Sequence, residues 1–240
     1  MKKLLFTLLI FTIHTSFGQW WNSKKIRGNG NVTKVERSVG KFDSVGVGGS
    51  FNVVLVDGKE GKVTIEGEEN IIPYIITEVK RGELKIKIKD NTNVRFNRKL
   101  TVTVPFEAIE GISLGGSGSI ISEKTVNGDQ VDFSIGGSGN IKTKVKASSI
   151  KSSIGGSGNI NLSGTADSMK CSIAGSGNIK AYDLTTNTLK VSVAGSGDIH
   201  VTVTERIKAS VAGSGSVYYK GNPKYIDTNS VGSGDVIKKD

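Results

Sequence analysis

The chain has 240 residues and a formal net charge of +10, with 36% hydrophobic residues and 32 glycines, about twice the average glycine usage. With only 3 prolines it is neither collagen-like nor a proline-rich disordered chain. The single cysteine, Cys171, excludes an internal disulfide framework, and the two histidines, His14 and His200, argue against most hydrolase triads, zinc enzymes and redox proteins.

The first eighteen residues (1–18) predict a secretory signal peptide. Two lysines precede an apolar run at 4–13, and Ser16 and Gly18 supply small residues at a cleavage site before Gln19. The run is too short for a membrane span, which needs about twenty apolar residues. We therefore expect an exported protein in the periplasm, on the outer-membrane surface or outside the cell, without a transmembrane segment after cleavage.

The next part of the sequence is irregular. We interpret residues 19–39 as an N-terminal extension, and residues 40–236 as one domain that begins with irregular turns and a cap at 40–110. A degenerate corner is expected at Gly49 and Ser50, and a short helix within 70–80, with Pro73 near its first turn. Strands are expected at 45–56, 62–65, 84–89 and 100–104.

A Gly-Ser-Gly tripeptide then recurs seven times, at intervals of 18 to 21 residues. A fixed period of this kind is typical of a solenoid. About 19 residues suit one turn of a three-sided β-helix, whose strands take about 4–6 residues each. We predict an all-β fold, a right-handed parallel β-helix with about six regular turns at 111–236. The central serines are Ser117, Ser138, Ser157, Ser176, Ser196, Ser214 and Ser233.

Three apolar columns emerge when the repeats are aligned on the central serine. They stand three residues before it, three residues after it and about twelve residues after it, and such columns suit strands stacked around a continuous core. In the first column are Leu114, Ile135, Ile154, Ile173, Val193 and Val211. In the second are Ile120, Ile141, Ile160, Ile179, Ile199, Val217 and Val236. In the third are Val131, Ile150, Met169, Leu189, Ile207 and Ile226. Just past the corner, Asn140, Asn159 and Asn178 can form a side-chain amide ladder.

The junction VPFEAIEGISLGGSG and the turns IGGSGNI, IAGSGNI and VAGSGDI, after an export signal, resemble the bacterial head-GIN family. The resemblance covers about residues 40–236. It implies a right-handed parallel β-helix, an envelope or surface location and an adhesin-like role, since members are described as auto-transporter adhesins. It brings no catalytic residues that could be transferred to this chain.

Nucleophilic and metal chemistry find little support in the sequence. Cys171 stands an even number of residues from an apolar column of the same strand, so its side chain should point into the core. His200 belongs to an outward column, so the two residues cannot form a catalytic dyad. The corners resemble calcium-binding nonapeptide repeats, but their period is 19 and most carry Asn or Ser. We expect no cofactor and no catalytic residue, while a weak calcium site near Asp198 or Asp235 stays open.

The predicted β-helix fold does not by itself exclude an enzyme. Polysaccharide lyases and glycosidases also use β-helices, and their sites need clustered carboxylates. The acidic residues of the regular turns fall in different columns or in separated turns. This pattern favours a non-catalytic module for binding or scaffolding, or a structural spacer, over a polysaccharide-active lyase or glycosidase.

One outward column contains lysine in four successive turns: Lys151, Lys170, Lys190 and Lys208. Lysines on strands about 4.8 Å apart repel by only about 0.9 kcal/mol per pair in bulk water. The column therefore favours a solvated face that keeps the protein soluble, with a cationic track for a polyanion as the alternative. Acidic glycan or lipopolysaccharide phosphate suits an exported protein, whereas the lack of interleaved aromatic residues argues against nucleic acid.

Overall fold

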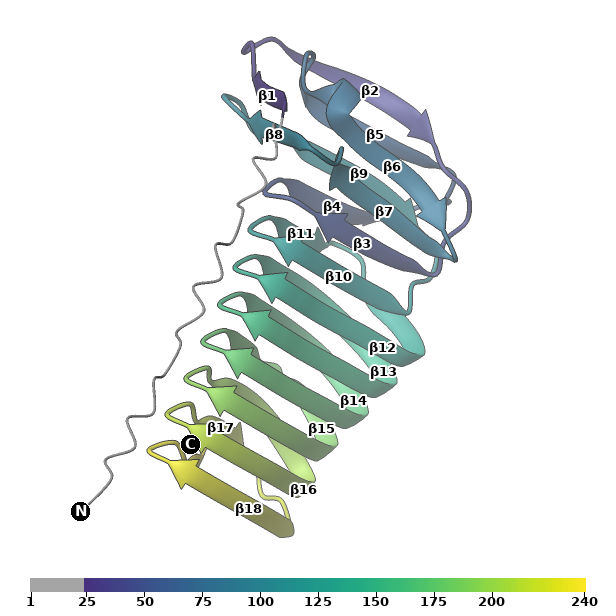
Figure 1. Cartoon of the computed structure of the whole chain (residues 1–240). Coiled ribbons are helices and arrows are strands. Elements are labelled where there is room, and N and C mark those ends of the chain that lie inside the picture. Colours follow the sequence, from purple (N-terminus) through teal and green to yellow (C-terminus); the bar gives the residue numbers. More distant parts are fainter. Residues whose placement is uncertain (1–23) are drawn as a thin grey trace, which may run out of the picture.

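The computed structural model describes residues 24–240, so the signal peptide predicted at 1–18 lies outside the described residues. The chain forms an elongated β-solenoid of about seven turns, about 19 residues apart, with 71% of residues in strands. Figure 1 shows the turns stacked in one direction, with a cap of shorter strands at the N-terminal end. The predicted all-β parallel solenoid is therefore confirmed.

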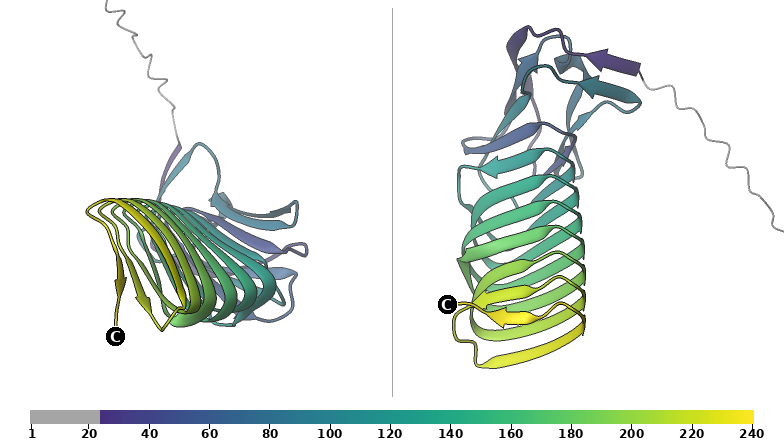
Figure 2. Two further views of the ribbon diagram at one scale, coloured as in Figure 1. Left: turned by 90° about the horizontal axis from the view of Figure 1, so that it is seen from below. Right: turned by 90° about the vertical axis from the view of Figure 1, so that its left-hand side faces the viewer.

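The regular turns are built from long strands that each pair in parallel with the strand of the next turn. Their stacking is visible in the right-hand view of Figure 2. These strands are β10 (Gly111–Gly116), β11 (Ser119–Ser122), β12 (Val126–Gly137), β13 (Asn140–Gly156), β14 (Asn159–Gly175), β15 (Asn178–Gly195) and β16 (Ile199–Gly213). The array ends with β17 (Val217–Lys220), β18 (Tyr225–Gly232) and β19 (Val236–Lys238).

Each Gly-Ser-Gly corner is locked onto the corner of the preceding turn. The carbonyl oxygen of Gly137 accepts backbone hydrogen bonds from Ser157 (2.9 Å) and Gly158 (3.0 Å). Gly156 has φ of +136°, and a Cβ there would lie 2.4 Å from the Gly137 oxygen. Glycine is required at this position both for its backbone conformation and for the close approach of the neighbouring turn.

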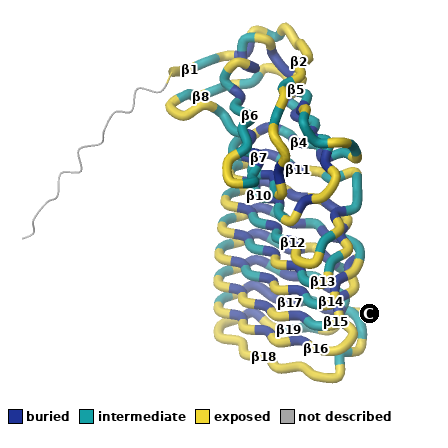
Figure 3. Tube along the Cα trace, turned by 90° about the vertical axis from the view of Figure 1, so that its right-hand side faces the viewer, coloured by how far each residue is buried: buried dark blue, intermediate teal, exposed yellow. Residues whose placement is uncertain are grey.

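The predicted apolar columns form the core. In the first column every member from Leu114 to Val211 is at most 3% exposed, and the other two columns are equally buried through the regular turns. Only the last turn differs, because no further turn covers it: Ile226 is 49% exposed and Val236 is half-buried. In Figure 3 the buried positions repeat along the stack, and the end at β18 is exposed.

The solenoid begins earlier than its regular repeats. Strands β3 (Ser44–Gly48) and β4 (Asn52–Asp57) pair in parallel with β10 and β11. The corner between them, predicted at Gly49 and Ser50, is confirmed, since the Gly49 carbonyl oxygen accepts hydrogen bonds from the backbone of Ser117 and Gly118. Residues 44–57 therefore extend the parallel array by one further layer at its N-terminal end.

The remaining N-terminal strands form a cap in which several pairs are antiparallel. The antiparallel pairs are β2 with β5, β5 with β9, and β6 with β7, and β1 pairs with β8 in a separate ribbon. Because antiparallel pairs cannot continue the parallel array, they close this end of the core. Their bounds are β1 (Lys24–Arg27), β2 (Val32–Ser38), β5 (Lys62–Glu68), β6 (Ile75–Lys80), β7 (Glu83–Ile88), β8 (Thr92–Arg95) and β9 (Thr101–Phe106).

The helix expected within 70–80 is wrong over most of that range. Only Ile72–Tyr74 form a single 3₁₀ turn, with Pro73 in its first positions, and β6 follows directly. Strand β6 pairs with β7 across a two-residue turn in which Arg81 (φ 54°) and Gly82 (φ 78°) both have positive φ. That geometry is typical of a type I′ hairpin, and the β-branched residues of β6 fit a strand better than a helix.

Candidate functional site

Four lysines follow one exposed face of the solenoid. Strand pairing places Lys151 of β13 beside Lys170 of β14, and continues the column with Lys190 of β15 and Lys208 of β16. All four side chains are exposed, on parallel strands about 4.8 Å apart. We call this column the lysine stripe, and its register is the one that the sequence predicts.

The stripe has an acidic residue at each end. Asp132 is paired in register with Lys151, and Asp227 with Lys208. The Lys208 Nζ lies 2.8 Å from a carboxylate oxygen of Asp227, with both side chains well exposed. Exposed pairs of this kind contribute little to stability. Among residues 24–240 no ion pair involves the other three lysines of the stripe.

Short side chains border the stripe on the side nearer the Gly-Ser-Gly corner. Two residues on from each lysine stands a serine, and two residues further stands glycine or alanine, in register from turn to turn. The lysines therefore stand beside a low, hydroxyl-bearing surface that does not obstruct them. The serines are Ser153, Ser172, Ser192 and Ser210, and the small residues are Gly155, Ala174, Ala194 and Ala212; Ser134 and Gly136 continue the two columns beside Asp132.

A hollow of about 860 Å³ opens on a different face, just past the Gly-Ser-Gly corners. Asn161 and Ser163 of β14 lie in its lining, with lysines from the strands on either side. We call it the lysine hollow. The sequence predicts an outward column for His200 and its equivalents, but the depression that short residues in one turn leave there is visible only in the structure. The lysines that line the hollow are Lys142, Lys144 and Lys180.

An aromatic stack borders the lysine hollow. The His200 ring is stacked on Tyr218 with centroids 4.9 Å apart, and it meets Tyr182 edge-on at 5.0 Å. Burial lowers the pKa of His200, as do Lys180 and Lys239, although Asp198 opposes them. His200 is therefore predominantly neutral near pH 7 and acts as part of an aromatic column.

A second hollow, also of about 860 Å³, lies along the opposite corner of the turns. Its lining includes three carboxylates, those of Glu110, Asp129 and Asp167, together with Lys146. All four side chains are exposed. Asp129 and Asp167 occupy equivalent places two turns apart, so their backbones are separated by about 9.5 Å, twice the strand spacing. We call this the acidic hollow; the sequence analysis did not find it, because its carboxylates come from separated turns.

The lone cysteine is part of the core. Cys171 is fully buried, and burial raises the pKa of its thiol to about 12. A thiol of this kind stays protonated and does not act as a nucleophile. His200 lies on an outward face, so the structure does not bring these two residues together, in agreement with the sequence analysis.

The acidic residues considered for calcium already serve the corner ladder. The amide ladder predicted at Asn159 and Asn178 is formed, and it continues as the Asn178 Oδ1 accepts from the backbone N–H of Asp198 (3.0 Å). An oxygen of Asp198 in turn accepts from the N–H of Ser216 (2.8 Å), and Asp235 accepts from its neighbour Val236 (2.7 Å). Within residues 24–240 no three His, Cys, Asp or Glu side chains group as metal ligands would.

The fold and these surfaces define a parallel β-solenoid whose long faces present side chains in periodic columns. No helix within residues 24–240 has the length and apolarity of a membrane span. The chain belongs to the family described as putative auto-transporter adhesin, head GIN domain, which matches residues 41–223. No curated protein matches its sequence significantly.

Three solved structures are similar to the chain along nearly its whole length. A putative adhesin from Bacteroides fragilis NCTC 9343 has a TM-score of 0.83 and 28% identity, covering 89% of this chain and 100% of that one. A putative lipid binding protein from Parabacteroides distasonis ATCC 8503 has a TM-score of 0.75 and 28% identity, with 90% and 100% covered. A putative adhesin from the same organism has a TM-score of 0.71 and 25% identity, with 90% and 100% covered.

Proposed function

We propose that the protein is an exported, non-catalytic, adhesin-like module that binds polyanionic polymers along its lysine stripe. The ligand chemistry is a chain of repeated negative charges, supplied by acidic polysaccharide or by lipopolysaccharide phosphate. The observation that carries the proposal is the register of four lysines in successive turns, three of them without an ion pair among the described residues.

Two physical features support a polymer as the ligand. Charges repeated at the strand spacing form a row along the solenoid, which matches a chain with regularly spaced anionic groups better than a single small ion. The low serine and glycine or alanine columns leave room for the chain beside the lysines. The electrostatic attraction between the lysines and an anionic polymer is long-ranged and is screened by salt. Binding of this kind therefore weakens as ionic strength rises.

The proposed location rests on the signal sequence and on the family. The apolar run at 4–13 and the small residues before Gln19 are typical of an export signal. Membership of an adhesin family supports a place at the cell surface. An exported protein meets envelope polymers first, and these are rich in anionic groups.

The experiment compares polyanion binding by the wild-type protein and by a variant with Lys151, Lys170, Lys190 and Lys208 all changed to Gln. Binding to an acidic glycan array and to lipopolysaccharide is measured at low and at physiological salt. A matched control changes four exposed lysines of the N-terminal cap, and so removes the same net charge away from the stripe. The control lysines are Lys34, Lys41, Lys59 and Lys89.

We expect the stripe variant to lose binding and the control variant to retain most of it. Loss of binding in both variants to the same degree would mean that net charge alone attracts the polymer. Absence of wild-type binding to every polyanion at low salt would refute the proposal.

The acidic hollow favours one other function, hydrolysis of a polysaccharide. Inverting glycosidases place two carboxyl groups about 6.5–9.5 Å apart, and the backbone separation of Asp129 and Asp167, about 9.5 Å, allows their carboxyl groups such a distance. Both side chains are exposed, whereas catalytic carboxylates of this type work in clefts that limit water. Incubation with a panel of polysaccharides and an assay for reducing ends tests this alternative, with Asp129→Asn and Asp167→Asn as the variants that should abolish any activity found.

A further inference from the structure

The lysine hollow is formed by a row of short side chains between two rows of long ones. On β14 the outward residues are Asn161 and Ser163, and the equivalent positions on β13 are Lys142 and Lys144. On the other side, Lys180 of β15 pairs in register with Asn161. Because the two rows of long side chains are two strands apart, the gap between them is about 9.5 Å wide at the backbone. This is wide enough to hold one small ring between them.

The wall on the β15 side is shaped by a bulge. The pairing of β14 with β15 shifts register between Asn161 and Gly164, where β15 contains one extra residue. Bulges of this kind re-aim a side chain, and here the bulged segment contains Tyr182 and Asp183, which both line the hollow. Lys220, from the later strand β17, lies over the Tyr182 ring with its Nζ 5.4 Å from the centroid. Lys220 therefore lies against one face of the Tyr182 ring, and the ring also forms part of the wall of the hollow.

The hollow is cationic, and its polar groups are unused. Within residues 24–240, Lys142, Lys144 and Lys180 form no ion pair. Asp183 is the one acidic residue in the lining. Asn161 and Ser163 make no side-chain hydrogen bond to another described residue, unlike the neighbouring asparagines of the corner ladder. Beyond Tyr182, the buried Nδ1 of His200 has no hydrogen-bond partner among the described residues.

We propose that the lysine hollow is a second binding site, distinct from the lysine stripe, and that it holds one acidic sugar residue of the uronate class. The uronate carboxylate lies among Lys142, Lys144 and Lys180. Their ammonium groups donate charge-assisted hydrogen bonds to it, which are stronger than hydrogen bonds between neutral groups. The sugar hydroxyls meet Asn161 and Ser163, and one apolar face of the ring packs on Tyr182. A volume of about 860 Å³ is within the ordinary range of small-molecule sites.

The arrangement favours an acidic sugar over a simple anion. Inorganic phosphate would use the lysines alone and leave the Tyr182 ring and the amide of Asn161 without a role. A neutral sugar would leave three lysines uncompensated. Only a ring that has both hydroxyl groups and a carboxylate uses all of these side chains at once.

The test titrates glucuronate and galacturonate into isotopically labelled protein and follows backbone amide shifts by NMR. Galactose and inorganic phosphate are titrated in parallel as the neutral-sugar and simple-anion probes. We expect the shifts caused by uronate to be centred on β13–β15 around Asn161, with a weaker response to galactose and to phosphate.

Two variants probe the site in different ways. Ser163→Tyr places a long side chain in the short row and fills the hollow without changing the charge. Lys142→Gln combined with Lys180→Gln keeps the hollow and removes two of its charges. We expect each to weaken uronate binding by about ten-fold or more, the scale of a lost charged hydrogen bond. Circular dichroism and thermal melting confirm that each variant is folded.

The stripe variant with four lysines changed to Gln serves as the control that separates the two proposals. It should bind uronate like the wild-type protein, and the Ser163→Tyr variant should bind long polyanions like the wild-type protein. Uronate binding that is unchanged in both hollow variants would overturn the inference. So would phosphate binding as tight as uronate binding, because the hollow would then be a general anion site, or galactose binding as tight as uronate, or no uronate binding at all.

Discussion

The corner glycines set the strictest local requirement in the molecule. Gly156 combines a positive φ of +136° with a Cβ position only 2.4 Å from the carbonyl oxygen of Gly137. We expect Gly156→Ala to destabilise the protein by about 1–3 kcal/mol from backbone strain alone, with a further cost from the displaced neighbouring turn. Denaturant unfolding of the variant measures this directly.

The adjacent glycine provides the matched control for this prediction. At Gly155 the nearest atom to an added Cβ is 3.9 Å away, and the equivalent position in the next turn is already Ala174. Gly155→Ala should therefore leave stability unchanged or raise it slightly, since alanine restricts the unfolded chain. Equal losses from the two substitutions would contradict the role assigned to the corner.

A second residue-scale feature is the buried carboxylate of Glu68, which joins three segments of the cap. Its two oxygens accept hydrogen bonds from the backbone N–H groups of Gly30 (2.7 Å), Asn97 (2.9 Å) and Arg98 (3.2 Å). Burial by itself would raise the pKa of Glu68, but these donors outweigh it and hold the pKa below its ordinary value of 4.5. The charged form is therefore the one that the folded cap stabilises.

We expect Glu68→Gln to lower stability at pH 7 by about 1–3 kcal/mol, because an amide offers one weaker acceptor and turns an N–H group toward backbone donors. Since the folded-state pKa is depressed, the stability that Glu68 contributes is complete above pH 4.5 and is lost as the pH falls through the folded-state pKa. The difference between wild type and variant should therefore narrow on acidification. Glu66→Gln, at an exposed site on the same strand, is the control and should change the free energy of unfolding little.

At the scale of the element, each long strand contributes one layer to the core, and the layers differ in the side chains that they place inside. One inward column runs from Ile112 through Phe133, Ser152 and Cys171 to Val191. The Ser152 hydroxyl is fully buried and has no hydrogen-bond partner among the described residues. A buried hydroxyl without a partner is unfavourable. We expect Ser152→Ala to raise the free energy of unfolding by about 1 kcal/mol, measured by denaturant unfolding.

A substitution on the next strand that is expected to lower the free energy of unfolding serves as the comparison for that measurement. Ile173 is 2% exposed, and Ile173→Ala should lower stability by about 2–5 kcal/mol, the usual range for such core truncations. If Ser152→Ala also destabilises, the Ser152 hydroxyl has a partner in solution, such as an internal water, and the assignment of an empty hydrogen-bond position is wrong.

The strands differ in how far the sequence alone could predict them. In the regular turns the glycine corners recur and the columns are β-branched, so register followed directly from alignment of the repeats, and Lys151, Lys170, Lys190 and Lys208 were placed together. Within 70–80 the deciding contact lies just outside the segment, because β6 forms a hairpin with β7 across Arg81 and Gly82, whereas Pro73 by itself favoured a helix.

The lysine hollow and the acidic hollow could not be predicted from the sequence for a similar reason. The lysine hollow depends on the lengths of side chains in three neighbouring turns and on the register shift at Tyr182. The acidic hollow draws its carboxylates from turns that are not adjacent. Alignment of repeats finds what successive turns share, and both hollows consist of what differs between turns.

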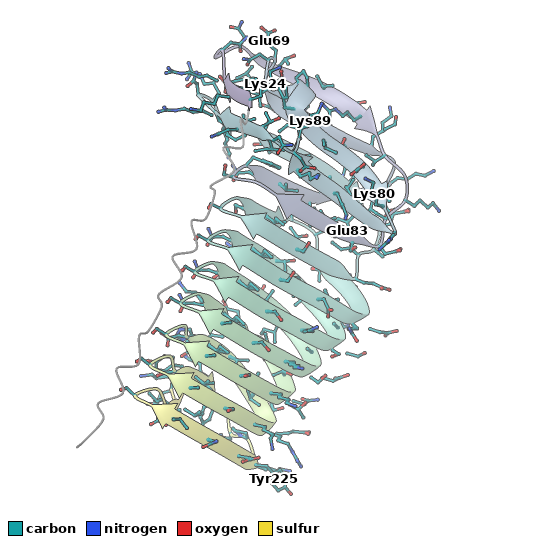
Figure 4. The ribbon with its side chains drawn as sticks, in the orientation of Figure 1. Lys24, Glu69, Lys80, Glu83, Lys89 and Tyr225 are labelled. Atoms are coloured by element: carbon teal, nitrogen blue, oxygen red, sulfur yellow. The ribbon has the colours of Figure 1, made fainter. Side chains whose placement is uncertain are left out.

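At the scale of the whole molecule, the two ends are closed in different ways. The N-terminal end is covered by the strands and loops of the cap, which carries many charged side chains, among them Lys24, Glu69, Lys80 and Lys89, as Figure 4 shows. The opposite end has only β18 and β19, and Tyr225, which Figure 4 places there, is 61% exposed. Strand β18 is exposed along its whole length.

The last turn acts as a polar cap through its inward positions. Thr228 and Ser230 of β18 stand in register with Ala209 and Val211 of β16, so these two inward columns end in hydroxyl groups that tolerate water, whereas the other two end in Ile226 and Val236. Repeat arrays need such atypical ends for solubility. Deletion of residues 221–240 would expose Ile207 and Val211, which are buried in the intact chain.

We therefore expect the chain truncated at residue 220 to melt at a lower temperature and to scatter more light on concentration than the intact protein. The full-length double variant Thr228→Val and Ser230→Val separates the two causes, because it keeps the last turn and makes its inner face apolar. It should melt near the wild-type temperature and still associate more strongly, since the open end would then resemble an exposed apolar edge. A truncated chain that stays as soluble and as stable as the intact protein would show that β18 and β19 do not cap the core.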